Sequence, residues 1–170
     1  MGFIFFIPLF FSCATNTNVI YNGENRYFEK SSNYSICPPA SWQVGEFPGF
    51  KNKILIGQAD NEITPSINFV EEKYDAQPKE YVDLSIGVLE KIYSDIKLLQ
   101  RKDFITAKNV KGEKIVYTIS QYGRFLRITQ YILPGKNGTY MIITCGASGL
   151  IGDKYDDLFD KTVRTFEWSK

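Results

Sequence analysis

The chain has 170 residues, a formal net charge of +1 and 44% apolar residues, including 13 Phe and 11 Tyr. This length and composition suit one domain with a substantial core. The balanced charge argues against nucleic acid as a partner, and the absence of histidine from the whole sequence excludes Ser-His-Asp triads and histidine-ligated zinc.

The first thirteen residues, MGFIFFIPLFFSC, are typical of an export signal. Residues 3–11 are apolar apart from Pro8, and this run is too short to span a bilayer, which needs about 20 residues. Ser12 and Cys13 then resemble the lipobox of bacterial lipoproteins, in which the cysteine is lipidated and becomes the mature N-terminus. We predict a signal peptide over residues 1–13, a lipid anchor on Cys13 and export to a bacterial cell envelope. The alternative is a buried strand with an incidental cysteine.

Residues 14–33 are rich in Asn, Ser and Thr and show no hydrophobic periodicity, so we expect a flexible polar tether there. The folded domain is then expected over residues 34–170. It contains Cys37 and Cys145, which could form a disulfide in an exported compartment. The alternative is that both are small buried hydrophobic groups, as free cysteines often are.

Short β-rich runs and one helix are predicted in the first half of this domain. The expected strands are Tyr34–Cys37, Lys53–Gln58 and Ser66–Val70. Pro78 suits the first turn of a helix, and the apolar residues after it recur at spacings of three and four. That stripe consists of Tyr81, Leu84, Val88, Leu89, Ile92 and Ile96. Gly87, inside the helix, indicates close packing on a sheet.

The second half is predicted to contain a strand near residues 96–106, a three-stranded meander and a second helix. The meander strands are Glu113–Gln121, Arg124–Leu133 and Tyr140–Cys145, all rich in Ile, Tyr, Phe and Thr. Apolar residues on both faces of the middle strand predict cover on both sides of the sheet. The helix is expected from Asp153 to Arg164, because acidic residues at its start complement the helix dipole.

The order of these segments resembles the PsbP-like domain. YSICPPASW, residues 34–42, is similar to that family's opening y-x-i-x-x-P-x-x-W pattern. Residues 112–133, 138–148 and 163–168 match its later parts in order. The family, which includes the DcrB-like envelope proteins, implies an α+β fold in which a mostly antiparallel sheet is sandwiched between helices. It has no common catalytic set, so the resemblance implies a non-enzymatic protein that binds or supports another protein and needs no cofactor or metal.

The stretch TCGASGLIG, residues 144–152, resembles the glycine turn of short-chain dehydrogenases, where glycines let the backbone approach a pyrophosphate. Its glycines are Gly146, Gly149 and Gly152, and Glu167 falls near the place of a ribose-binding acid. However, the preceding strand closes an antiparallel meander rather than opening a parallel sheet. We therefore expect an ordinary strand-to-helix loop and keep a nucleotide-binding enzyme as the alternative.

Other candidate chemistry is weaker. Ser85 lies in mid-helix without the Gly-x-Ser of a nucleophile elbow. Glu71 and Glu72 would point to opposite faces of a strand, and Asp156 and Asp157 would lie 100° apart on a helix. None of these groups is expected to form an acid–base pair or a metal site. A third hypothesis, a small-ligand carrier with its ligand between helix and sheet, rests on the aromatic content alone.

Overall fold

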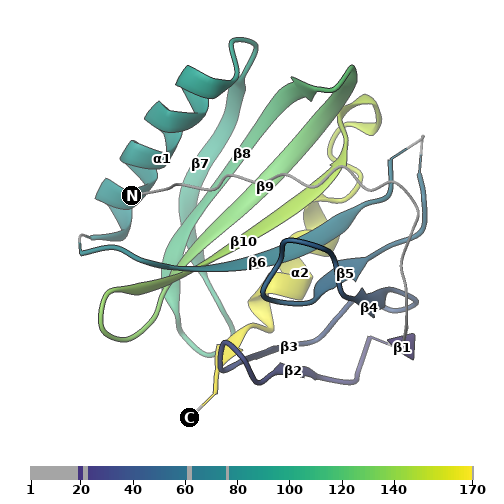
Figure 1. Cartoon of the computed structure of the whole chain (residues 1–170), viewed down its shortest axis with the longest axis vertical. Helices are drawn as coiled ribbons and strands as arrows, with labels where there is room; N and C mark the ends of the chain where they lie inside the picture. The colour runs from purple at the N-terminus through teal and green to yellow at the C-terminus, as the bar shows by residue number, and fades with distance from the viewer. Residues whose placement is uncertain (1–18, 21–22, 61–62, 76, 170) are drawn as a thin grey trace.

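The computed structural model describes residues 19–20, 23–60, 63–75 and 77–169. It is an α+β fold with one large sheet, one small sheet and two α-helices (Figure 1). Neighbouring strands run antiparallel in every pairing of both sheets. This confirms the predicted fold class.

The large sheet has eight strands. In spatial order they are β1 (Val19–Ile20), β4 (Gln43–Gly45), β5 (Ile54–Ile56), β6 (Ser66–Lys73), β10 (Thr139–Ser148), β9 (Arg124–Pro134), β8 (Lys111–Gln121) and β7 (Lys97–Ile105). The small sheet has the order β11 (Glu167–Trp168), β3 (Tyr34–Ile36) and β2 (Tyr27–Glu29). The helices are α1 (Pro78–Ile92) and α2 (Asp156–Arg164), with a 3₁₀ turn, η1 (Gly149–Ile151), before α2.

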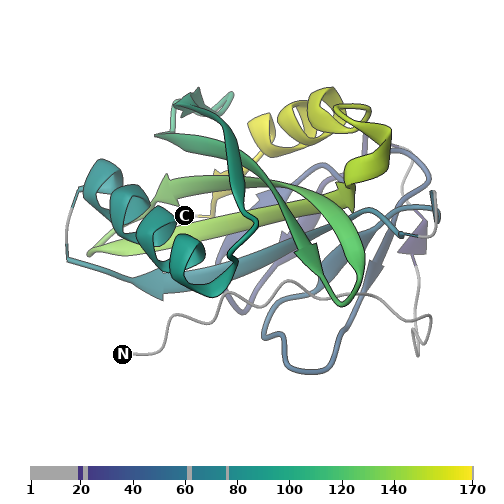
Figure 2. The same cartoon turned by 90° about the horizontal axis from the view of Figure 1, so that it is seen from above.

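The two helices cover opposite faces of the large sheet (Figure 2). Strand β9 shows how one strand serves both layers, since successive side chains point to opposite faces. Leu126 and Ile128 are buried in the apolar cluster under α1, whereas Tyr131 and Leu133 are buried in the cluster under α2. The predicted cover on both faces of this strand is therefore confirmed.

Helix α1 begins at Pro78 as predicted, but it presents a different face to the sheet. Its buried residues are Tyr81, Val82, Ser85 and Leu89. Leu84 and Ile92, which we expected in the stripe, are exposed. Ser85 is accommodated in the core because its Oγ donates a hydrogen bond to the Tyr81 carbonyl oxygen at 2.8 Å.

The prediction that Gly87 allows α1 to pack closely on the sheet is wrong. A Cβ at this position would meet nothing within 4 Å, so the glycine does not serve close packing on the sheet. Helix α1 also ends at Ile92, four residues before the last residue of the predicted stripe.

The expected boundary between tether and domain is also wrong. Strand β2 pairs with β3, and Arg26 Nη1 donates to the Thr165 carbonyl oxygen at 2.9 Å. Glu29 is buried and accepts hydrogen bonds from Ser31 and from the Tyr27 hydroxyl. The folded region therefore includes residues that we assigned to the tether over 14–33. Cys13 lies outside the described residues.

Candidate functional site

The dehydrogenase-like glycines do not form a nucleotide site. Gly146 lies inside β10, paired with Ile128 of β9 on one side and Ser66 of β6 on the other. A dinucleotide binds at the carboxyl ends of parallel strands, and β10 is antiparallel to both neighbours. The segment containing Glu167 pairs with β3 in the other sheet. The geometry opposes the nucleotide-binding alternative.

The remaining glycines of this stretch serve the turn between β10 and α2. Gly152 has a φ of +60°, which favours glycine. At Gly149 the constraint is space, because a Cβ would lie 2.4 Å from Cδ1 of the Phe125 ring. Ser148 caps η1 by accepting a hydrogen bond from the Leu150 N–H at 3.3 Å.

The two cysteines of the domain are both free in the structure. Cys145 is fully buried in the cluster under α2, and burial raises the pKa of its thiol well above the ordinary value. Cys37 is half-buried after β3, where its backbone N–H donates to Thr165 Oγ1 at 2.8 Å. A disulfide between them is not part of the described fold, and Cys145 has the environment of a small core residue.

The adjacent carboxylates are used separately. Glu71 pairs with Lys51 at 3.3 Å, whereas Glu72 accepts the Tyr81 hydroxyl at 2.6 Å. Asp156 receives two hydrogen bonds from the guanidinium of Arg127, at 2.9 and 2.7 Å. Within the described ranges, no group of three or more acidic or cysteine side chains could hold a metal ion.

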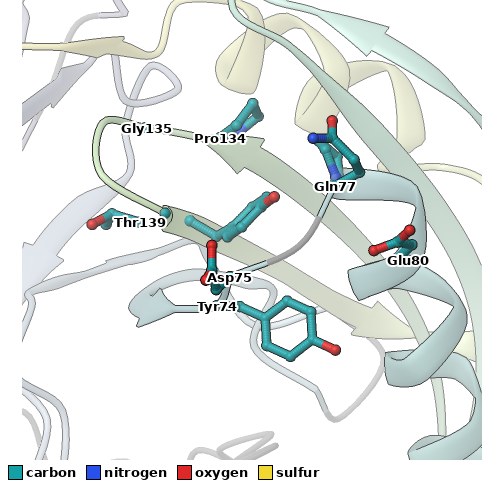
Figure 3. Close-up of a pocket in the computed structure, with 10 residues that line it drawn as sticks. Tyr74, Asp75, Gln77, Glu80, Pro134, Gly135 and Thr139 are labelled. Atoms are coloured by element: carbon teal, nitrogen blue, oxygen red, sulfur yellow. The ribbon is translucent and has the colours of Figure 1, made fainter.

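A hollow of about 550 Å³ lies where the β6–α1 connection meets the β9–β10 turn (Figure 3). The carboxylates of Asp75 and Glu80 line it together with Tyr74 and Tyr140, and no Lys or Arg is among its described lining residues. Two carboxylates would repel a phosphate, so this hollow does not suit a nucleotide. The space between α1 and the sheet is filled by the apolar cluster described above, so the hollow is not the helix–sheet site expected of a small-ligand carrier.

A buried polar network joins the sheet to α2. The Lys114 side chain is 2% exposed, and its Nζ lies 2.5 Å from Asp160 Oδ1. The Tyr131 hydroxyl donates to the same oxygen at 2.5 Å. Burial, the nearby Cys145 and the Asp160 carboxylate raise the pKa of Tyr131. These groups satisfy one another and fix the position of α2, which is a structural role.

Many of the exposed apolar side chains stand at three connections: α1 to β7, β8 to β9 and β10 to α2. Six of the nine large hydrophobic side chains that are exposed in the described residues belong to these connections or to the ends of the helices and strands that they join. We call this set the apolar end: Ile92, Leu98, Leu99, Tyr122, Phe125 and Leu150. Tyr122 is 85% exposed and Leu150 is 74% exposed.

The three connections that carry the apolar end all lie in the upper part of Figure 1. Polar contacts join the α1–β7 connection to the β8–β9 turn. The Gln121 amide donates to the Tyr93 hydroxyl at 3.1 Å, and Asp95 accepts the Ser120 N–H at 2.7 Å. Where exposed apolar side chains form a contiguous patch, they are typical of a surface that binds another molecule.

The comparisons with known proteins bear on the fold. No model of a protein family matches the chain, and no curated protein sequence matches it. The chain is, however, similar to several solved structures. LpqN of Mycobacterium tuberculosis, described as involved in cell envelope biogenesis, is 12% identical over 91% of this chain and 90% of its own, with a TM-score of 0.62. The cyanobacterial PsbP protein CyanoP of Synechocystis is 12% identical over 91% of this chain and 97% of its own, with a TM-score of 0.60.

A third similar structure is the Ran-binding protein Mog1p of Saccharomyces cerevisiae. It is 11% identical over 91% of this chain and 96% of its own, with a TM-score of 0.61. At these identities the comparisons show the fold, which is that of a PsbP-like domain as the sequence predicted. None of the helices in the described ranges is long and apolar enough to cross a membrane.

The sequence gives little indication of the apolar end. Leu98 and Leu99 stand together in KLLQRKDFI, and Tyr122 stands beside a turn glycine; both are ordinary for strands and hairpins. A signal was present in Leu150, a large apolar residue between two loop glycines. The resemblance of those glycines to a phosphate-binding turn obscured this signal.

Proposed function

We propose that this chain is a lipid-anchored, non-catalytic protein of a bacterial cell envelope whose PsbP-like domain binds another protein. The apolar end is the observation that carries the protein-binding part. A protein partner would bury Tyr122 and Leu150, and removing apolar surface from water stabilises a complex by roughly 25 cal/mol per Å² before the costs of association. The anchor rests on the lipobox-like Ser12-Cys13 pair.

The comparisons support this proposal without establishing it. LpqN takes part in envelope biogenesis and Mog1p binds the protein Ran. Both share the fold of this chain at low sequence identity, so a binding role is consistent with the fold.

The binding part is tested by affinity capture from membranes with the full chain and intact Cys13. The test variant is Tyr122→Ser with Leu150→Ser, which removes the two most exposed side chains of the apolar end. The control is Phe28→Ser, because Phe28 is 61% exposed in β2, outside the apolar end. We expect the test variant to lose a specific partner at least tenfold and the control to retain it. Equal capture by both variants would reject the apolar end as the binding surface.

The anchor is tested independently by Cys13→Ala. Wild type should incorporate a labelled fatty acid and sediment with membranes, whereas the variant should remain unlabelled. More than one acyl chain is needed for stable anchoring, so the label should be retained through membrane washing. A wild-type protein that is unlabelled and soluble would remove the lipoprotein part of the proposal.

A further inference from the structure

Strand β7 forms one edge of the large sheet (Figure 1). It pairs with β8 from Lys97 to Ile105, and among the described residues no strand pairs with its outer side. The outer N–H and C=O groups of such an edge are a template for one more strand. At the opposite edge, β1 has only the residues Val19–Ile20. The sheet can therefore be extended most readily at β7, along the part before Ile105, because the Ile105 carbonyl oxygen already accepts a hydrogen bond from Arg164.

The pairing register assigns the β7 side chains to faces. Arg101 lies opposite Ile115, which belongs to the cluster under α1, so Arg101 points to the α1 side. Lys102 is its neighbour in the strand and points to the α2 side, because side chains alternate. Leu98 and Ile105 lie on the α1 side and are both nearly half exposed.

Charge differs between the two sides of this edge. On the α1 side, Arg101 is balanced by hydrogen-bonded ion pairs with Asp83 and Glu113, and Asp103 adds a further carboxylate. Lys102, on the α2 side, is exposed and has no ion-pair partner within the described part of the chain.

Helix α2 adds a second cation to that side. The Arg164 guanidinium donates to the Ile105 carbonyl oxygen at 3.1 Å and lies 5.1 Å from the centre of the Phe104 ring. Phe104 belongs to the cluster under α2, which places Arg164 beside the same side of β7 as Lys102. Lys114, which lies opposite Lys102, is balanced by Asp160. The edge is therefore net positive on its α2 side, whereas Asp83, Asp103 and Glu113 outnumber Arg101 on its α1 side.

This charge pattern favours an acidic strand over a second copy of the chain as the partner of β7. A second copy paired antiparallel about a two-fold axis would bring Lys102 and Arg164 of both copies onto one face, where like charges repel. A strand with acidic residues at alternate positions would place them beside these cations instead. Its other residues would lie beside Leu98 and Ile105, where apolar side chains are favoured.

We propose that β7 binds an extended, acidic segment of another protein by strand addition, with the acidic side chains on the α2 side and apolar side chains on the α1 side. Backbone hydrogen bonds supply the attraction in this mode, and alternate side chains supply the selectivity. The proposal rests on the protein-binding function above and names the chemistry of the segment. Lys102 would also discourage self-association at the same edge.

The experiment uses the full chain and three blocked nine-residue peptides. One alternates Glu and Val, the second alternates Lys and Val, and the third is the Glu–Val peptide with alternate backbone nitrogens methylated. Hydrogen exchange of residues 97–105 is measured with each peptide. We expect the Glu–Val peptide at saturation to slow exchange in β7 at least tenfold. The other two peptides should protect β7 less, because one has the wrong charge and the other has lost the N–H donors along one of its edges.

A charge reversal tests the side-chain part. Lys102→Glu should weaken binding of the Glu–Val peptide about tenfold. The matched control, Lys136→Glu, makes the same change at an exposed residue of the β9–β10 turn and should have no effect. Circular dichroism checks that both variants are folded. An unchanged affinity in Lys102→Glu, or equal protection of β7 by the Lys–Val or methylated peptide, would overturn the proposal.

The two proposals can fail separately. If membrane capture depends on Tyr122 and Leu150 but the Glu–Val peptide does not protect β7, strand addition is wrong and the apolar end still binds a protein. If the peptide protects β7 but membrane capture is equal in all variants, the apolar end is wrong and the edge still binds an acidic segment.

Discussion

The two faces of the large sheet are covered by different chemistry. Helix α1 has fifteen residues and packs through aliphatic and tyrosine side chains, with Tyr81 stacked on Tyr140 at a ring separation of 5.2 Å. Helix α2 has nine residues and is held by ion pairs to Lys114 and Arg127 as well as by Phe159 and Val163. A helix of nine residues is unstable by itself, so the directional contacts fix where α2 lies. The difference is one of degree: α1 relies mainly on buried apolar side chains, with Tyr81 bonded to Glu72 and the exposed Asp83 paired with Arg101, whereas the shorter α2 adds partly buried ion pairs.

The largest loss of stability is expected for Asp160→Asn, which removes the ion pair between α2 and Lys114 of the sheet. The change keeps the shape of the side chain but leaves the buried Lys114 ammonium without its counter-charge, which costs about 3–5 kcal/mol. Urea unfolding at pH 7 measures it. The control is the triple variant Lys114→Met, Tyr131→Phe, Asp160→Leu, which leaves no charge unpaired and should be the more stable of the two. A cost below about 1 kcal/mol for the single change would contradict the assigned role.

The α1 face is tested by Leu89→Ala, which should lower the free energy of unfolding by about 2–4 kcal/mol, since Leu89 is fully buried. Leu84→Ala is the matched control on the exposed side of the same helix and should cost less than about 0.5 kcal/mol. Similar costs in urea unfolding would mean that the helix packs on the sheet through the stripe expected from the sequence.

The variants Tyr81→Phe and Tyr131→Phe test whether the two helix layers contribute to stability independently. Each removes a hydroxyl that donates to a carboxylate, from Tyr81 to Glu72 and from Tyr131 to Asp160, and should cost about 1.5–3 kcal/mol. The two pairs share no partner and lie on opposite faces, so the double variant should show the sum of the single costs within about 0.5 kcal/mol. A larger deviation in urea unfolding would show that the layers are coupled.

The smallest effect concerns the small sheet and is a dependence on pH. Burial raises the pKa of Glu29, but hydrogen bonds from Ser31 and Tyr27 outweigh it, so the folded pKa lies below the ordinary 4.5. Its contribution to stability is therefore present above pH 4.5 and is lost as pH falls through the folded value. Thermal unfolding between pH 6 and pH 3 should show a shallower decline for Glu29→Gln than for wild type. Parallel curves would contradict the lowered pKa.

The fold was predictable because its long segments follow simple periodicities. The strands β8, β9 and β10 and the start of α1 at Pro78 are all close to their expected positions. The N-terminal strand β2 was missed because Tyr27–Glu29 has only three residues and stands in a polar stretch, where a short pairing with β3 leaves no periodic pattern. The buried face of α1 was predicted incorrectly because apolar residues lie along two overlapping stripes of the helix. The stripe that packs on the sheet is the one that contains Val82 and Ser85.

The candidate binding surfaces could not be predicted in the same way. The charged residues of KLLQRKDFI are common in edge strands, but they also occur in strands that expose one face, so they do not by themselves show that the outer side of this strand is open. The buried Lys114 also lacks a sequence signal, since it stands in a lysine-rich stretch and its partner Asp160 lies on another element. In contrast, the glycines at 146, 149 and 152 gave a strong local signal that the topology overruled.

The place of β10 in the large sheet has a consequence for biosynthesis. This late strand inserts between β6 and β9, so that Ser66 pairs with Gly146, and Ser35 pairs with Glu167 in the small sheet. A nascent chain therefore cannot complete either sheet until its C-terminal segments leave the ribosome. Pairings this distant in sequence also form slowly. We expect a newly made chain to remain unfolded long enough to be threaded through a membrane channel, as an export signal at its N-terminus would require.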